Sequence, residues 1–310
     1  MTDRRVLITG AGAVSPAGVG ADALWETLAA GRSTAAEQEA LAGAPLRWAC
    51  AVPEFNPRKL IKQRKAIKLM CRDIMFAAVA SQEAADAAAV ADEAIPRERA
   101  GVVLGAGLIT TELQEFTQGV AAARDSDGKL DMKAFGSEGI GTFFPLWMLK
   151  YLPNMLSCHV SIFHDLQGVS NTVTTGNTSA HQSIGEALNI VRRDNADIMV
   201  AGAGESKVHP LVMARMNLQG LLPPEEGDPA AASRPFDKTH AGSLASEGAG
   251  ILVLEEADHA EKRGRTPLAE IAGFSAVCGG SSPHCYEGMR EPIEKAIRRA
   301  LEQAGVSPED

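Results

Sequence analysis

The stretch VSNTVTTGNTSAHQSIGEALNIVRR, residues 169–193, joins a strand pattern directly to a helix pattern. Its first eight residues are rich in β-branched side chains and favour an extended strand. The rest favours an amphipathic helix with an apolar stripe at Ile184, Leu188 and Val191. The candidates for its N-cap are Asn177, Thr178 and Ser179. A strand that ends at a helix N-terminus presents free backbone N–H groups and the positive end of the helix dipole, a geometry that suits acyl transfer.

The same alternation of strand and helix runs along the whole chain. Short β-branched runs that end in glycine predict buried strands at residues 4–12, 100–107 and 197–204. Periodic or Ala-rich segments predict helices at 20–31, 64–90, 178–194 and 290–305. Two later segments, at 251–256 and 267–277, are predicted as strands. Residues 221–235 have the composition of a surface loop. This alternation predicts an α/β fold.

Composition narrows the classes of function. The chain has 310 residues and a formal net charge of −9, so we expect neither a nucleic-acid partner nor a membrane partner, since both need clustered cations. Five widely spaced cysteines without a C-x-x-C pair, and no signal-type N-terminus, predict a cytoplasmic protein with no disulfide framework. No H-x-x-x-H pair is present, and the GAGAVS turn at 10–15 lacks the third glycine of a dinucleotide fingerprint, so we expect no metal and no cofactor.

Asn177 limits the chemistry of the strand-to-helix junction. Its amide nitrogen is delocalised and has no accessible anionic form near neutral pH. Asn177 can therefore donate and accept hydrogen bonds, but it cannot form a thioester. The residues leave two interpretations open: Asn177 is a binding group at the mouth of a site, or it is only the cap of the helix.

Three blocks of the chain resemble the thiolase-fold β-ketoacyl-ACP synthases of type II fatty-acid and polyketide systems. The blocks begin at RRVLITGAG (4–12), FFPLWMLKY (143–151) and ASRPFDKTH (232–240), and the last one continues into SEGAGILVLEE (246–256). The resemblance implies a layered α-β-α-β-α sandwich, with an N-terminal ketosynthase-like half at 1–255 and an incomplete C-terminal half at 256–310. We therefore expect apolar sheet edges that a further segment or another polypeptide covers, or a reorganised second half.

The resemblance also places the family's nucleophilic cysteine on Asn177, and its catalytic histidine and lysine motifs beyond Asp310. Similar cysteine-less members, the chain-length factors or KSβ subunits, pair with an active ketosynthase and shape the tunnel for the growing chain. By this resemblance the chain is a non-condensing, chain-length-factor-like subunit that forms a heterodimer with a ketosynthase, or a homodimer, and meets acyl carrier protein. Two alternatives stay open: a malonyl-ACP decarboxylase or other acyltransferase-type homologue that needs a further C-terminal segment, and a purely structural, degenerate or split ketosynthase. Whether the chain is itself an enzyme stays open with them.

Charge and the resemblance point to further site residues. The segment 57–72 holds seven cations and no acid, and its helical spacing predicts a positive face, although a simply solvated face fits as well. In this segment we expect carrier protein or the active partner to contact Arg64, Lys65 and Lys68. The resemblance places near the acyl tunnel Phe144, Trp147, Met148 and Phe163, which core packing would explain equally well. His181 follows one helical turn after Asn177, a spacing that points it toward the same cleft. The resemblance places Asn171 and Thr172 at a dimer interface.

Overall fold

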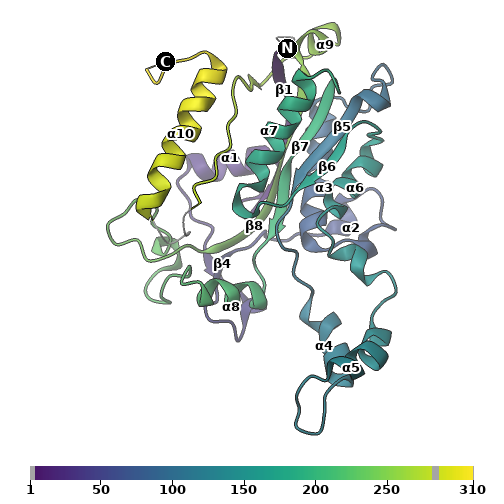
Figure 1. Cartoon of the computed structure of the whole chain (residues 1–310), viewed down its shortest axis with the longest axis vertical. Helices are drawn as coiled ribbons and strands as arrows, with labels where there is room; N and C mark the ends of the chain where they lie inside the picture. Colours follow the sequence, from purple (N-terminus) through teal and green to yellow (C-terminus); the bar gives the residue numbers. More distant parts are fainter. Residues whose placement is uncertain (1–3, 281–285, 310) are drawn as a thin grey trace.

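The computed structural model describes residues 4–280 and 286–309 of the chain. A mixed sheet forms its centre, with strands in the order β2, β1, β8, β7, β5 and β6 (Figure 1). The long strands are β1 (Val6–Ser15), β5 (Ala100–Gly105), β6 (Ser170–Val173), β7 (Ile198–Ser206) and β8 (Ala245–Glu256). β5 is parallel to β6 and β7, whereas β8 is antiparallel to both β1 and β7. Five predicted strands are thus confirmed, and the α/β class with them.

Shorter elements complete the chain. The short strands are β2 (Gly18–Val19), β3 (Ala36–Glu37), β4 (Trp48–Cys50) and β9 (Ala269–Glu270). The helices are α1 (Ala21–Ala29), α2 (Pro57–Leu60), α3 (Arg72–Ala87), α4 (Leu113–Ala122), α5 (Met132–Ala134), α6 (Met155–His164), α7 (Ser179–Arg192), α8 (Pro210–Leu218), α9 (Ala257–Lys262) and α10 (Tyr286–Ala304). In the described part of the chain, no helix combines the length and the apolar character that crossing a membrane requires.

Helices cover both faces of the sheet. α3 and α6 pack on one face and α7 on the other (Figure 1). β5 is buried on both faces, since Val102 belongs to the core under α3 and α6 and Val103 to the core under α7. Complete burial of such side chains stabilises the fold by about 2 kcal/mol each. A parallel strand covered on both faces needs a continuous apolar run, which explains the pattern at 100–107.

Two glycines of the GAG motif allow β1 and α3 to approach closely. A Cβ atom at Gly10 would lie 2.2 Å from the carbonyl oxygen of Ala84, and one at Gly12 would lie 2.1 Å from that of Ala80. Both distances are far inside van der Waals contact. These two glycines within β1 therefore allow α3 to pack closely on the strand.

The structure corrects two predicted elements. The helix predicted at 64–90 begins only at Arg72, because Ile61 and Met70 are both buried in the core and hold the segment between them in turns and a short 3-10 helix. The strand predicted at 267–277 is limited to β9, which pairs with β1. Beyond it, the backbone N–H of Phe274 donates instead to the side chain of Gln303 on α10. An extended segment without a neighbouring ladder does not form a sheet strand.

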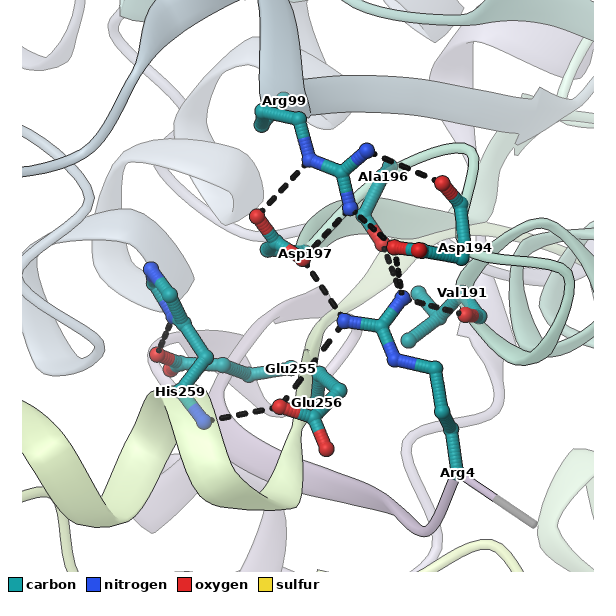
Figure 2. A network of polar contacts seen from close by, with 9 residues as sticks. All are labelled: Arg4, Arg99, Val191, Asp194, Ala196, Asp197, Glu255, Glu256 and His259. Carbon is teal, nitrogen blue, oxygen red and sulfur yellow. Dashed lines mark hydrogen bonds and ion pairs between the residues drawn. The ribbon is translucent and has the colours of Figure 1, made fainter. Parts of the chain in front are cut away.

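A network of ion pairs ties together the amino ends of the parallel strands (Figure 2). Asp197 accepts from Nη2 of Arg4 at 2.7 Å, and from Nε and Nη2 of Arg99 at 2.8 and 2.7 Å. Both arginines also bind Asp194, and Arg4 lies 3.8 Å from Glu256. These residues come from the start of β1, β5 and β7 and from the end of β8. The network therefore fixes the register of these strands at one end of the sheet, opposite to the carboxyl ends of the parallel strands.

Residues 106–154 form an excursion between β5 and α6. It carries α4 and α5 away from the sheet (Figure 1). Large apolar side chains are exposed on it, among them Leu108, Met132, Ile140, Phe144 and Met148. Exposed apolar surface of this extent is typical of an interaction surface.

Candidate functional site

Asn177 lies at the carboxyl edge of the parallel strands, in the turn between β6 and α7. A 3-10 helix at Gly176–Thr178 makes this turn, and Gly176 has the left-handed φ of 64° that favours glycine. The N-cap of α7 is Thr178, without a side-chain cap bond. Asn177 is exposed. The structure therefore does not use Asn177 as the helix cap, and the interpretation that it is a binding group remains.

A lysine that follows β7 holds the Asn177 side chain. The Lys207 ammonium donates to Oδ1 of Asn177 at 2.6 Å, and its Nζ lies 3.5 Å from Oε2 of Glu205. An ammonium group only donates hydrogen bonds, so the amide oxygen must face the lysine. The Nδ2 group of Asn177 is then left as a donor toward a ligand. The arrangement can hold a carbonyl or an oxyanion, and it contains no group at residue 177 that could attack one.

On the other face of β7, a second polar cluster is fixed by buried carboxylates. Glu247 is nearly fully buried and accepts from Arg72 Nε at 2.7 Å and Arg72 Nη2 at 2.5 Å. It also accepts from the Ser206 hydroxyl at 2.6 Å. The Ser206 backbone N–H donates to Asp73 at 3.0 Å, and burial raises the pKa of Asp73 to about 6. Arg72 and Glu247 line a cavity of about 720 Å³ beside the α8 N-terminus.

The predicted tunnel residues do not share one cavity. Phe144 and Trp147 line a cavity of about 250 Å³ together with Phe143, whose ring centroid is 4.8 Å from that of Trp147. Met148 follows Trp147 on the same 3-10 helix and is exposed. Phe163 lines a different cavity, of about 350 Å³, under α6. His181 is exposed on the first turn of α7.

The predicted partner residues lie on the surface. Arg64, Lys65 and Lys68 are all exposed, although they stand in turns and a 3-10 helix and not on adjacent turns of an α-helix. Within the described ranges none of the three forms an ion pair with an acidic side chain. A cluster of unpaired cations on an acidic protein suits an acidic partner.

Asn171 and Thr172 belong to β6, the last strand of the sheet order, whose outer edge has no strand partner among the described residues. The Ser157 hydroxyl fixes β6 on α6, at 2.8 Å from both the Asn171 carbonyl oxygen and the Thr172 hydroxyl. Asn171 is exposed and Thr172 is half-buried. An open edge strand of this kind is available for pairing with a second chain.

Sequence reasoning missed Lys207, Glu205, Arg72, Glu247 and His209. The signal that could have found three of them is their position: Glu205, Lys207 and His209 come at or directly after the carboxyl end of a predicted parallel strand, where α/β proteins bind ligands. Arg72 was counted only as one cation of a basic segment.

Comparison with known proteins places these observations in a family. The family profile described as Beta-ketoacyl synthase, N-terminal domain, matches residues 3–260. The oxytetracycline polyketide β-ketoacyl synthase 1 of Streptomyces rimosus is 31% identical over 310 residues, covering 99% of this chain and 70% of that protein. The 3-oxoacyl-acyl-carrier-protein synthase 2 of Vibrio cholerae is 30% identical, covering 100% and 72%.

Solved structures of β-ketoacyl synthases superpose on this chain. A β-ketoacyl synthase from Burkholderia phymatum superposes with a TM-score of 0.81 at 28% identity, over 98% of this chain and 71% of that one. The ishigamide ketosynthase/chain length factor gives 0.77 at 27% identity, over 99% and 71%. The profile spans most of the chain, and both structures superpose over nearly all of it. The chain therefore belongs to the β-ketoacyl synthase family and has its thiolase-like layered α/β fold.

Proposed function

We propose that this chain is a non-condensing subunit of a type II synthase, which pairs with an active ketosynthase and helps to shape the space for the growing acyl chain. The observation that carries the proposal is the contact between Lys207 and Asn177, the residue that the resemblance places at the family's nucleophile position. An amide held by an ammonium group can bind a carbonyl oxygen but cannot form the acyl-enzyme intermediate. Condensation would then depend on a cysteine supplied by a partner.

The surface supports pairing with a second ketosynthase-like chain. Among the described residues β6 has no strand partner on its outer edge, and the excursion at 106–154 exposes large apolar side chains. One structural neighbour is described as a ketosynthase/chain length factor, which makes a two-subunit assembly the natural comparison. Pairing through a sheet edge and an apolar surface would give a large interface. We place Asn171 and Thr172 in that interface.

The exposed cations support docking of a carrier protein. A further neighbour is described as a type II polyketide acyl-carrier protein in complex with its ketosynthase. In our proposal Arg64, Lys65 and Lys68 form the docking surface of this chain, because an acidic carrier would gain charge complementarity there.

Reconstitution with a cysteine-containing ketosynthase and malonyl-loaded carrier protein tests the function. We expect no condensed product from this chain alone, and products of altered chain length when it is combined with the ketosynthase. Release of CO2 from malonyl carrier by this chain alone would instead support the decarboxylase, for which the donor groups of Asn177 and Lys207 are the favouring observation. Chain lengths identical with and without this chain would refute the proposal.

A charge-reversal variant tests the docking surface. The triple change Arg64→Glu, Lys65→Glu and Lys68→Glu should weaken carrier or ketosynthase binding about tenfold or more at low salt. The matched control reverses three exposed lysines elsewhere, at Lys238, Lys262 and Lys295, with the same change in net charge. Equal binding by the two triple variants would contradict a specific role for the segment.

A further inference from the structure

A buried carboxylate on α3 holds the carboxyl end of β7, from which Lys207 reaches Asn177. Asp73 lies on the first turn of α3 and is only 6% exposed. Its Oδ1 accepts from the backbone N–H of Ser206 at 3.0 Å, and Ser206 directly precedes Lys207. The Lys207 side chain then leaves toward the opposite face of the sheet and donates to Asn177. Asp73 thus anchors the backbone one residue before the lysine.

The first turn of α3 lies directly on this end of β7. A Cβ atom at Gly204 would lie 2.9 Å from the Asp73 carbonyl oxygen and 3.1 Å from the Cβ atom of Ala77. Both distances are too short for a side chain in a packed interior, so glycine at this position allows the approach. The approach brings the Asp73 carboxylate within reach of the Ser206 N–H. A change at this carboxylate therefore acts on the strand end without a flexible side chain between them.

The surroundings of Asp73 make its charge sensitive to pH. Burial raises the pKa of Asp73 to about 6, and the Glu205 carboxylate on β7 acts in the same direction. The Ser206 N–H and the Cys71 thiol both donate to the carboxylate and act in the opposite direction. Burial raises the pKa of Cys71 as well, so its thiol keeps the proton that it donates. Asp73 therefore changes its charge in a range where an exposed aspartate stays ionised.

Other titratable side chains on the elements packed against α3 have partners of their own. They are Glu247 on β8, bound to Arg72, and Cys158, His159 and His164 on α6, bound to Asn154, to the backbone of Leu69 and to Ser81. β1 carries no titratable side chain. After β7 comes His209, whose Nδ1 accepts from the Leu211 N–H at 3.2 Å and whose pKa is lowered by burial. The titration of His209 must be separated from that of Asp73.

We propose that Asp73 is a proton-responsive positioning residue, whose carboxylate holds Lys207 against Asn177 and whose protonation loosens that contact. A hydrogen bond to a carboxylate is about twice as strong as one to a neutral acceptor, so protonation weakens the tether to Ser206. The neutral acid also gains an O–H donor, which the Glu205 carboxylate beside it accepts. Glu205 now lies 3.5 Å from the Lys207 ammonium, and its withdrawal removes one of the two partners that fix this group.

This inference deepens the proposed function and rests on it, because it describes how the same binding group is regulated. The site is organised while Asp73 is ionised, and it loosens as the pH falls and Asp73 takes up a proton. The measurement uses this chain alone. A chain that pairs with no ketosynthase can still show the titration, and a chain that pairs can lack it, so the two failures are distinguishable.

Two amide signals report the two ends of this connection. The chain is labelled with heavy nitrogen in serine and asparagine, and NMR follows the Ser206 backbone amide and the Asn177 side-chain amide from about pH 5 to about pH 8. We expect both signals to shift with one common midpoint near pH 6. Asp73→Asn is isosteric and uncharged, and it should abolish both transitions. His209→Asn is the matched control, which keeps a good helix cap and should leave both transitions in place.

Two further variants test how the signal travels. Lys207→Met should keep the Ser206 transition and lose that of Asn177, because the ammonium that joins them is absent. Glu205→Gln should lower the midpoint of both transitions without removing them, because the charge that opposes ionisation of Asp73 is gone. Both residues are half-buried and exchange nearly isosteric side chains, so these tests stand even where Asp73→Asn fails to fold.

Four outcomes would overturn the inference. The first is a wild type whose Ser206 amide shows no transition in this range. The second is an Asn177 transition that persists in Lys207→Met, since it would reflect a direct effect of charge through space. Loss of both transitions in His209→Asn, or in Glu205→Gln, would assign the titration to those residues and not to Asp73.

Discussion

Asn177→Cys would place a thiol beside the Lys207 ammonium, and the geometry predicts an activated cysteine. Nζ of Lys207 now lies 2.6 Å from Oδ1 of Asn177. A cysteine side chain is shorter, so the sulfur would lie about 4 Å from the ammonium. At this separation and at an effective dielectric constant near 20, two unit charges attract by about 4 kcal/mol. The thiolate is therefore favoured over the thiol.

The net effect is smaller than this attraction. Side-chain exposure of Lys207 and the nearby Glu205 carboxylate both weaken it, and we take about 1.4 kcal/mol, which is one pKa unit. A thiol pKa that falls from about 8.5 to about 7.5 raises the thiolate fraction at pH 7 from about 3% to about 24%. Alkylation by iodoacetamide should then proceed about eightfold faster, because the thiolate is the reacting form.

The assay follows iodoacetamide labelling against pH and assigns each modified peptide by mass spectrometry. Exposed Cys278 serves as an internal reference, and burial raises the pKa of Cys71, so that thiol should not compete. The comparison variant is Asn177→Cys combined with Lys207→Met, which removes the ammonium at similar side-chain length. If the two variants label with the same pH midpoint, the contact between Lys207 and residue 177 is not the controlling interaction.

Three further outcomes follow from the packing and the ion pairs. Asp197→Asn should lower the free energy of unfolding at pH 7 by about 2 kcal/mol and the Tm by about 3 °C. The guanidiniums of Arg99 and Arg4 hold the pKa of Asp197 well below its usual range, so its stabilising effect is complete above about pH 4 and is lost as the pH falls. The difference between wild type and variant in urea unfolding should accordingly shrink at pH 3, and a constant difference would contradict this origin. Gly12→Ala should destabilise by about 3 kcal/mol because its Cβ would meet the Ala80 carbonyl, whereas Gly250→Ala meets no atom and should be nearly neutral in the same denaturation experiment.

The sequence predicted those elements whose structure is determined locally. The strand and helix at 169–193 form as expected, because β-branched content, cap candidates and helical spacing all agree there. The segment at 64–71 belongs to the helix predicted at 64–90 from its periodic, Ala-rich pattern. Two buried apolar anchors at Ile61 and Met70 overrode that pattern, and an anchor of this kind is visible only once the core exists.

In the candidate site, too, the sequence predicts what is determined locally and misses what depends on long-range contacts. Asn177 could be found because one segment carries the strand, the turn and the helix. Lys207 could not be paired with it from the sequence, since the contact joins residues 30 positions apart through the parallel order of β6, β5 and β7.

Alternation at the carboxyl end of β7 then directs Ser206 and Lys207 to opposite faces of the sheet. Ser206 points to the face that carries Glu247 and the cavity, and Lys207 points to the face that carries α7 and Asn177. A one-residue slip of β7 would exchange these contacts, placing the ammonium beside Arg72 and the hydroxyl beside Asn177. The ion pairs of Asp197 at the amino end of β7 resist that slip. Weakening this distant network should therefore reduce the activation of a cysteine at residue 177 by Lys207, as well as the stability of the fold.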